Sequence, residues 1–547
     1  MKKSIKFLAS AVLGIAAVAC ASPEKMAKLA ENVQVTCEPA VLEAVADVIE
    51  ADVTVTYPKD YFNPKAILEV TPVIVYDGGE AALKPFVYQG EKVKDNYKVV
   101  SSDGQTVSEH LAFDYVEGME SCYLELRAVA KAKNKSVTLP SRKIAIGCNT
   151  TYMLVEAEGE TPLKEDGYQD VIALSSEGQI LYLVNSSDVR SAQLKSQSIK
   201  DFQAALDKIA ADERTTLTGT EIVAYASPEG AIDLNNKLSG KRSESANKAW
   251  KEVVKGHEAS DPEVKSLGED WEGFQELVAE SDIQDKALIL RVLSMYSDPA
   301  VRESEIRNMS EIFTELKDEV LPELRRARLI VNSEYKNFTS EELLALVEND
   351  VEALDEPALL RAATLVKDNA KKEALYQKAI DKFGSKSASF NLAVLYANDG
   401  KVEKAHALIK GLDQDADVKN LLGVIALRDN DLDTAEQYFK ASGTDAAKAN
   451  LGVVDILKGQ YDKAVKDLKA VSDKGYNLAL AYLLTDQPDK ALEAITCGCP
   501  KSAYLRAICA ARQGDAAKVE KWLNSATSRS AFYRERAEKD VEFIDFR

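Results

Sequence analysis

Hydrophobic and polar residues alternate along short stretches in the first third of the chain. The apolar run Ala66–Tyr76 is rich in β-branched residues and ends at the turn signal Asp77-Gly78-Gly79. Cys122–Ala130 and Arg142–Ile146 alternate in the same manner. Short strands separated by turn signals are typical of a β-sandwich. We therefore predict an immunoglobulin-like β-sandwich over residues 35–150, acting as a spacer or protein-contact module because it carries no ligand-binding motif.

A mixed pattern follows over residues 151–335 and predicts an α/β sandwich domain. Strands alternate with helices, whose apolar residues recur at helical spacing. A helical insertion occupies about residues 256–320. The predicted elements are strands at Tyr152–Glu156, Ile180–Val184, Leu217–Ala226 and Leu324–Val331, and helices at Ser198–Ala211, Leu234–Val254, Asp285–Met295 and Glu303–Leu316.

From residue 340 to 547 the pattern is helical and repeats. Small residues at Ala393, Gly423, Gly452 and Ala479 fall 30, 29 and 27 residues apart. Alanines 405, 435, 464 and 491 keep the same intervals. A small residue where two helices cross, a polar turn and a second alanine resemble the tetratricopeptide repeat (TPR), although these copies are shorter than its usual period of about 34 residues. The resemblance implies an α-solenoid of short repeats that binds a protein partner, or alternatively a scaffold that only spaces and stiffens.

The stretch from Ile222 to Ser243 resembles a second family, the OmpA-like peptidoglycan-associated domain. In that family a strand leads into G-H-T-D-x-x-G, and a helix opens on Y-N-x-x-L-S-x-x-R-A. Ser227 stands where the family has the aspartate. The positions that match in register are Gly230, Asn235, Leu238, Ser239 and Arg242.

This resemblance implies a site for the diamino acid of peptidoglycan. The free N–H groups of a helix N-terminus suit its carboxylate, and an arginine adds a bidentate contact. Because Ser227 carries no charge, Glu229 or Asp233 would have to receive the ammonium group. The alternative for Arg242 is a salt bridge with one of these carboxylates. The peptidoglycan-binding candidates are Ser227, Glu229, Gly230, Asn235 and Arg242.

The first residues have the pattern of a targeting segment. Lys2, Lys3 and Lys6 precede an apolar run that ends at Ala17-Val18-Ala19-Cys20. Small residues before a cysteine resemble a bacterial lipobox, with an ordinary secretory signal as the alternative. We predict a signal peptide over residues 1–19, lipidation at Cys20 and a tether over residues 20–34. The resemblance implies anchoring in the outer membrane, on its periplasmic face or at the cell surface.

Charge, cysteine content and the absence of known motifs in the sequence limit the possible classes of function. The 547 residues carry a net charge of -20, which argues against a nucleic-acid partner. The pattern Cys497-Gly498-Cys499 is read as small residues in a loop, and two of Cys37, Cys122 and Cys148 could pair in an oxidising compartment. No catalytic motif, metal-ligand cluster or cofactor fingerprint stands out, so we predict no catalytic residue, metal or cofactor.

Taken together, the modules predict a non-enzymatic scaffold lipoprotein that anchors or organises a protein complex at the outer membrane. Its OmpA-like domain would contact peptidoglycan. The main alternative is an accessory subunit of a secretion or nutrient-uptake complex without wall binding. A cell-wall hydrolase is the enzymatic alternative, and it ranks below both.

Overall fold

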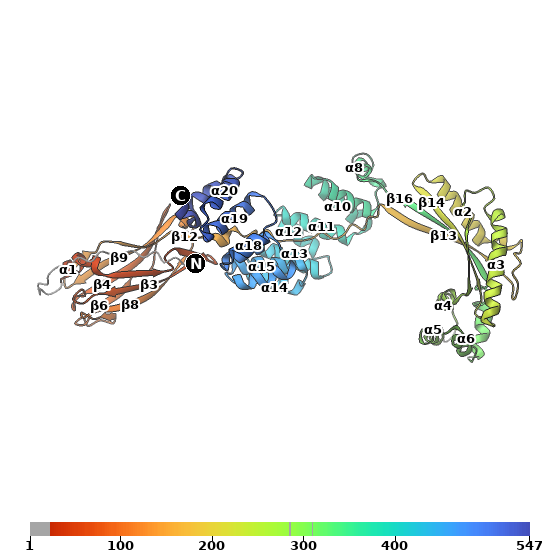
Figure 1. Ribbon diagram of the computed structural model, residues 1–547, viewed down its shortest axis with the longest axis horizontal. Helices are drawn as coiled ribbons and strands as arrows, with labels where there is room; N and C mark the ends of the chain where they lie inside the picture. The colour runs from red at the N-terminus through yellow and green to blue at the C-terminus, as the bar shows by residue number, and fades with distance from the viewer. Residues whose placement is uncertain (1–21, 284–285, 309) are drawn as a thin grey trace. The chain divides into compact units, whose positions relative to one another are not determined.

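The computed structural model describes residues 22–283, 286–308 and 310–547. The predicted signal peptide and Cys20 lie outside these residues. The chain forms two compact units, one made of Met1–Lys164 with Ser385–Arg547 and the other of Glu165–Gly384. Figure 1 labels their helices and strands, and each unit is described on its own.

The first unit begins with two β-sheets that share one core. One sheet has the order β1-β3-β2-β12, with β8 also paired to β3; the other has the order β10-β9-β4-β6-β7, with β11 on β9 and β5 on β4. Buried side chains of both sheets, such as Ile49 and Leu124, belong to one apolar cluster. The strands are β1 (Gln34–Glu38), β2 (Leu42–Val45), β3 (Val48–Tyr57), β4 (Ile67–Tyr76), β5 (Gly79–Ala82), β6 (Phe86–Gly90), β7 (Lys98–Val100), β8 (Gln105–Asp114), β9 (Cys122–Ala132), β10 (Lys135–Thr138), β11 (Arg142–Ile146) and β12 (Cys148–Asn149).

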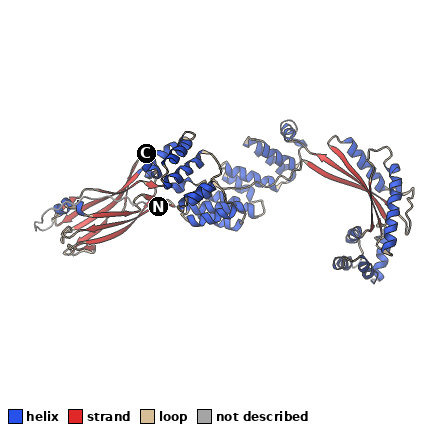
Figure 2. Cartoon of the chain, viewed as in Figure 1, coloured by secondary structure: helices blue, strands red, loops and turns tan. Residues whose placement is uncertain are grey.

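This sheet-rich region confirms the predicted β class of the N-terminal part, shown in red in Figure 2. The expected tether differs from the structure. Residues Pro23–Lys28 form α1, which lies against β9 and β10. Met26 is fully buried, and Glu24 pairs with Lys135 at 3.0 Å. Burying Met26 stabilises the docked helix by about 2 kcal/mol, and Pro23 is buried as well.

The cysteines also differ from expectation. Cys37, Cys122 and Cys148 are buried and free, so the pairing considered among them is not formed. Cys497 and Cys499 form a disulfide, whereas the sequence reading left them as unpaired loop residues.

The second unit contains a four-stranded sheet with the order β13-β16-β14-β15. β14 and β15 are parallel and the other neighbours are antiparallel. Phe202 and Trp250, from two helices, pack in one cluster with Ile222 and Leu329 of the sheet. The elements are β13 (Val171–Leu181), α2 (Gln197–Ala211), β14 (Thr215–Ala226), α3 (Ile232–Val253), β15 (Glu263–Glu269), α4 (Trp271–Glu280), α5 (Lys286–Met295), α6 (Pro299–Asn308), α7 (Ser310–Glu319), β16 (Arg326–Lys336), α8 (Ser340–Asn349), α9 (Glu356–Leu365) and α10 (Asn369–Phe383).

Three predicted features of the central region differ from the structure. Residues Thr151–Leu154 form a 3-10 helix where a strand was expected, and the chain up to Lys164 belongs to the first unit. β13 starts earlier, at Val171, than the predicted strand. The insertion was expected to be helical, but it also contributes β15, which extends the sheet beside β14.

The C-terminal part of the first unit is a series of helix pairs, which confirms the predicted TPR-type repeat region. Ala405, Ala435, Ala464 and Ala491 are all fully buried. The helices are α11 (Lys386–Asn398), α12 (Val402–Ile409), α13 (Ala416–Arg428), α14 (Leu432–Ser442), α15 (Asp445–Leu457), α16 (Tyr461–Val471), α17 (Tyr476–Leu484), α18 (Pro488–Ala494), α19 (Pro500–Gln513), α20 (Ala516–Thr527) and α21 (Ala531–Lys539), followed by a 3-10 helix (Val541–Phe546).

Close helix crossings explain the small residues of the repeats. A Cβ atom added to Gly423 would lie 2.5 Å from the Phe439 ring, and one added to Gly452 would lie 2.3 Å from Leu468. The last 3-10 helix lies against both the repeats and β12, since Phe543 packs on Tyr504 of α19 and Val541 lies against Gly147. Arg512 and Glu542, an ion pair beside β12, extend this junction, with Glu542 also accepting from Asn149.

Candidate functional site

Four asparagines occupy equivalent positions in the first helices of successive repeats. Asn391, Asn420, Asn450 and Asn477 lie on α11, α13, α15 and α17, and they are 29, 30 and 27 residues apart. The first three are 1–2% exposed, and Asn477 is half-buried. A buried amide needs hydrogen-bond partners, because leaving one unpaired costs about 1–3 kcal/mol. We call these four residues the asparagine ladder.

The partners come from residues 155–164, the threaded segment, which precedes the second unit in sequence. Asn477 accepts from the Glu156 N–H at 2.9 Å and donates to the Glu156 carbonyl at 3.0 Å. Asn391 accepts from the Lys164 N–H at 2.7 Å and donates to the Lys164 carbonyl at 3.1 Å. Each amide thus holds both main-chain groups of one residue.

The middle of the ladder holds a single residue with two amides. Asn450 accepts from the Glu160 N–H at 2.8 Å and donates to the Glu160 carbonyl at 2.9 Å. Asn420 donates to the same carbonyl at 2.8 Å. The two amides also bond to each other at 3.0 Å, so neither side chain is left without partners.

The contacts recur at Glu156, Glu160 and Lys164, every fourth residue of the threaded segment. The segment runs opposite to the order of the repeats, since its first contact is to the last asparagine. An amide that takes both the N–H and the C=O of one residue reproduces the pairing that a neighbouring β-strand would offer. The asparagines contact only main-chain atoms of the segment, so these hydrogen bonds do not select particular side chains at Glu156, Glu160 and Lys164.

Charged contacts close both ends of the segment. Glu156 pairs with Lys501, and Lys164 pairs with Asp417 and, at 3.0 Å, with Asp415. Burial alone would lower the pKa of Lys164, but hydrogen bonds to the two aspartates outweigh it and raise the pKa. The lysine therefore stays charged, which favours this end of the segment in its seated position.

Between these ends the segment packs lightly on the repeats. Arg428 donates to the Glu158 carbonyl at 2.7 Å. Gly159 adopts φ +73°, and a Cβ there would lie 2.9 Å from Val424. Glu158 and Glu160 are exposed, and Leu163 is 46% exposed. Side chains thus contribute little burial, and the main-chain bonds hold most of the segment.

Arg242, predicted as a ligand-binding residue, is 1% exposed. Its guanidinium donates to the carbonyls of Ser186, Tyr225 and Leu183 at 3.0, 2.9 and 3.2 Å. Burial lowers its pKa to about 10. The arginine joins the end of β14 to the loop after β13, so in this structure its donors serve the fold.

The other peptidoglycan candidates lie in the turn after β14 and at the start of α3, and their polar groups have partners within the unit. Ser227 donates to Glu229 at 2.9 Å, and Arg325 pairs with Glu229 at 2.8 Å. Asn235 donates to Glu269 at 2.9 Å.

The insertion reaches the same turn through α6. The Gly230 N–H donates to the Glu303 carboxylate at 2.7 Å. This N–H belongs to the turn that the resemblance assigns to the carboxylate of a bound ligand. A carboxylate of the chain itself therefore occupies one donor of the predicted site.

Sequence reasoning missed the asparagine ladder. Each asparagine stands two or three residues before the small residue that marks its repeat, and this recurrence is visible in the sequence. The signal is a polar residue at a fixed position among buried apolar ones. Its partner could not be inferred, because the threaded segment lies 227 residues or more away in sequence.

Comparison with known proteins adds little beyond the repeats. No protein-family model matches the chain, and no curated protein matches it. A tetratricopeptide repeat protein from Parabacteroides merdae is similar in structure, with 16% identity and a TM-score of 0.29 over 37% of this chain and 91% of that one. The Cut9–Hcn1 heterotetramer of the APC/C shows 14% identity and a TM-score of 0.32 over 63% and 81%. These TM-scores and identities are too low to support a functional argument. The argument for function therefore rests on the geometry of the asparagine ladder.

Proposed function

We propose that this chain is a non-enzymatic scaffold whose TPR-type repeats organise a protein complex by gripping extended polypeptide backbone. The carrying observation is the asparagine ladder, in which three side-chain amides each hold the N–H and the C=O of one residue. Such pairing is open to any extended segment that presents free main-chain groups.

The chain's own threaded segment is the occupant seen in the structure. A partner's segment would have to displace it, against the high effective concentration of a covalently linked occupant. The exposed side chains of the segment and its dependence on main-chain bonds lower the cost of that displacement. The scaffold would thus exchange one extended strand for another on the same asparagines.

A binding experiment in trans tests this proposal. Glu160→Pro removes the N–H that Asn450 accepts, and it loosens the chain's own segment without altering the repeats. A fluorescent peptide with the sequence of residues 155–164 should bind the full-length Glu160→Pro chain more tightly than the wild type. Fluorescence anisotropy measures the affinity.

Two controls decide whether the main chain carries the binding. A peptide that keeps the residues equivalent to Glu156, Gly159 and Lys164 but has the others scrambled should bind with similar affinity. One methylated on the main-chain nitrogen of its sixth residue, the equivalent of Glu160, should not bind. Adding Asn450→Ala to the Glu160→Pro chain should abolish binding. Failure of the unmodified peptide to bind the Glu160→Pro chain would show that the ladder serves only as an internal brace.

The location of the scaffold is proposed from the sequence. Cys20 would carry the lipid and hold the chain at the outer membrane, since the predicted signal ends in small residues directly before it. In the described ranges, no helix has the length and apolarity needed to cross a membrane. Labelling cells with a radioactive fatty acid tests the anchor: wild-type chain should take up label, and Cys20→Ala should not.

Contact with peptidoglycan stays a prediction, and one observation favours the alternative of a complex subunit without wall binding. The Glu303 carboxylate already accepts a hydrogen bond from the Gly230 N–H. Co-sedimentation with purified sacculi separates the two. If Glu303 blocks the site, Glu303→Ala should pellet with sacculi more than the wild type or the control Glu315→Ala. Strong pelleting of the wild type, displaced by free diamino acid, would instead support wall binding.

A further inference from the structure

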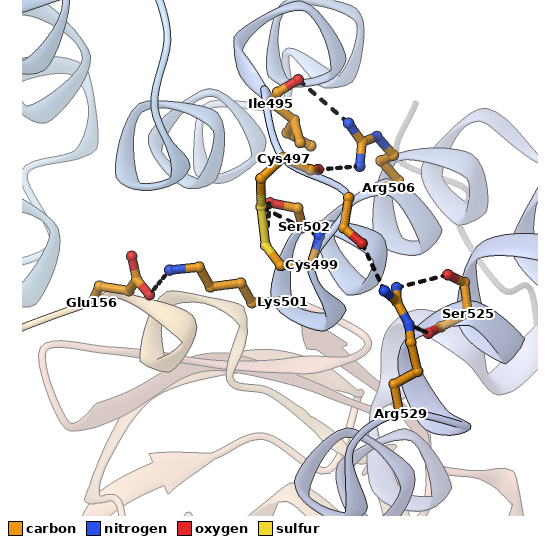
Figure 3. The surroundings of a disulfide bond; sticks show 10 residues. Glu156, Ile495, Cys497, Cys499, Lys501, Ser502, Arg506, Ser525 and Arg529 are labelled. Atoms are coloured by element: carbon orange, nitrogen blue, oxygen red, sulfur yellow. Dashed lines mark hydrogen bonds and ion pairs between the residues drawn. A yellow bond between two sulfur atoms is a disulfide. The ribbon is translucent and has the colours of Figure 1, made fainter.

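The disulfide Cys497–Cys499 lies in the loop between α18 and α19. Cys497 is exposed, as is Gly498, and Cys499 is half-buried. Figure 3 shows the two sulfur atoms beside Ser502, with Arg506 and Arg529 directed at the loop. The pair is therefore open to attack by a molecule from outside.

The other cysteines of the described chain are chemically quiet. Cys37, Cys122, Cys148 and Cys509 are all buried. Burial raises the pKa of Cys37 to about 11 and that of Cys122 and Cys509 to about 12, so these thiols hold their protons at neutral pH. Reactivity follows thiolate character and access. Within the described residues, thiol chemistry is thus concentrated at the exposed pair.

A purely structural role does not account for this disulfide. The two cysteines are separated by one residue, and a cross-link that closes so short a loop removes little freedom from the unfolded chain. Both cysteines lie in the same loop, so the disulfide links no two helices to each other. Exposed disulfides are the labile ones in proteins, whereas structural disulfides resist reduction.

The surroundings suit a thiolate leaving group. Ser502 is 2% exposed, and its hydroxyl oxygen lies 3.1 Å from Cys497 Sγ and 3.4 Å from Cys499 Sγ. The Cys499 N–H donates to Cys497 Sγ at 3.4 Å. Cys499 also stands directly before the first turn of the 14-residue helix α19, where the helix dipole favours negative charge.

Two arginines hold the loop from outside. Arg506 donates to the Cys497 carbonyl and Arg529 to the Gly498 carbonyl, both at 2.8 Å. Their positive charge beside the loop adds to the stabilisation of a thiolate, while Lys501 of α19 is turned toward Glu156 of the threaded segment. The loop is therefore braced in place, yet Cys497 stays exposed.

We propose that Cys497 and Cys499 form a thiol–disulfide exchange site that oxidises thiol groups of other molecules. A partner thiolate attacks Cys497 Sγ, the Cys497–Cys499 bond breaks, and its electron pair leaves on Cys499 as a thiolate that takes a proton from water. A second partner thiolate attacks the sulfur of the first partner cysteine and releases the Cys497 thiolate. The partner gains a disulfide and loses two electrons, and the loop becomes a dithiol.

Exchange kinetics test the site on the full-length chain carrying Cys20→Ala, so that the loop is the exposed cysteine pair under study. Oxidised protein is mixed at pH 7 with a synthetic peptide bearing two cysteines, and separately with glutathione. Mass spectrometry follows the peptide disulfide and the new protein thiols. The peptide should react with the loop at least about 5-fold faster than with oxidised glutathione, because the leaving thiolate is stabilised.

Variants tie the reaction to the loop. Cys497→Ala with Cys499→Ala should oxidise no peptide, and Ser502→Ala and Arg529→Gln should each slow the exchange by about 3-fold. In Cys499→Ser, the lone Cys497 should form a mixed disulfide with oxidised glutathione. Reaction with the peptide alone assigns protein dithiols as the substrate, and reaction with glutathione alone assigns small thiols. Exchange no faster than that of oxidised glutathione, or unchanged in the double variant, overturns the proposal.

Discussion

Removing Asn450 is expected to loosen the threaded segment by an amount that follows from its contacts. Its amide makes three hydrogen bonds, at 2.8 and 2.9 Å to Glu160 and at 3.0 Å to Asn420. A hydrogen bond contributes about 1 kcal/mol net, but Asn420 still donates to the Glu160 carbonyl, so we expect Asn450→Ala to lower the free energy of local opening by about 2 kcal/mol.

Limited proteolysis measures this opening. A glutamate-specific protease cleaves after Glu158 and Glu160 only when the segment leaves the repeats. When opening is fast relative to cleavage, the rate tracks the open population, and about 2 kcal/mol corresponds to roughly 30-fold faster cleavage. The matched control is Asn524→Ala, because Asn524 is an exposed asparagine on α20.

Two results would refute the reasoning. Cleavage within about 3-fold of the wild type would mean that side-chain packing, and not the amides, holds the segment. Equal acceleration by Asn524→Ala would indicate a general loss of helix stability. Glu160→Pro removes the same hydrogen bond from the segment side, so it should accelerate cleavage after Glu158, the glutamate of the pair that remains, even if Asn450→Ala disturbs α15.

Three further outcomes follow from the described contacts. Gly423→Ala should lower the free energy of unfolding of the first unit by about 1–3 kcal/mol, because its Cβ meets the Phe439 ring. The control Gly411→Ala, where the nearest atom is 3.6 Å away, should leave that free energy unchanged. Thermal melts of the two variants test the difference. Arg242→Ala should destabilise the second unit by about 3 kcal/mol or more, because three carbonyls lose their donor; an unchanged calorimetric transition would contradict this. Burial raises the pKa of Asp455 to about 6 in the folded chain, above its ordinary value of 3.8. The folded state therefore binds this proton more tightly, and stability is lost as pH rises from about 4 to about 6. Asp455→Asn should remove this pH dependence, measured by denaturant unfolding at several pH values.

The helical repeats were predictable because their signal is local and periodic. Small residues at a helix crossing are dictated by the space available, as Gly423 against Phe439 shows. The strands and helices around Ile222–Ser243 were also readable from hydrophobic period. By contrast, β15 is largely exposed and polar, and it exists because the edge of β14 offers it hydrogen bonds. The residues of β15 carry no hydrophobic alternation from which the strand could be predicted.

The ladder and the disulfide depend on contacts that a one-dimensional pattern does not hold. An asparagine within a helix is usually a surface residue, and Asn450 becomes a binding group only because Glu160 is brought to it by folding. In the same way, the predicted role of Arg242 rested on spacing, whereas its buried position is set by the carbonyls around it. Long-range geometry decided these roles.

Site-resolved hydrogen exchange of the threaded segment tests the central claim most directly. The ladder takes the N–H groups of Glu156, Glu160 and Lys164, which are four residues apart. The account predicts that these three amides exchange far more slowly than those of Ala157, Thr161 and Leu163, and that Asn450→Ala removes the protection of Glu160 first. Uniformly fast exchange across residues 155–164, with no recurrence at every fourth amide, would contradict it.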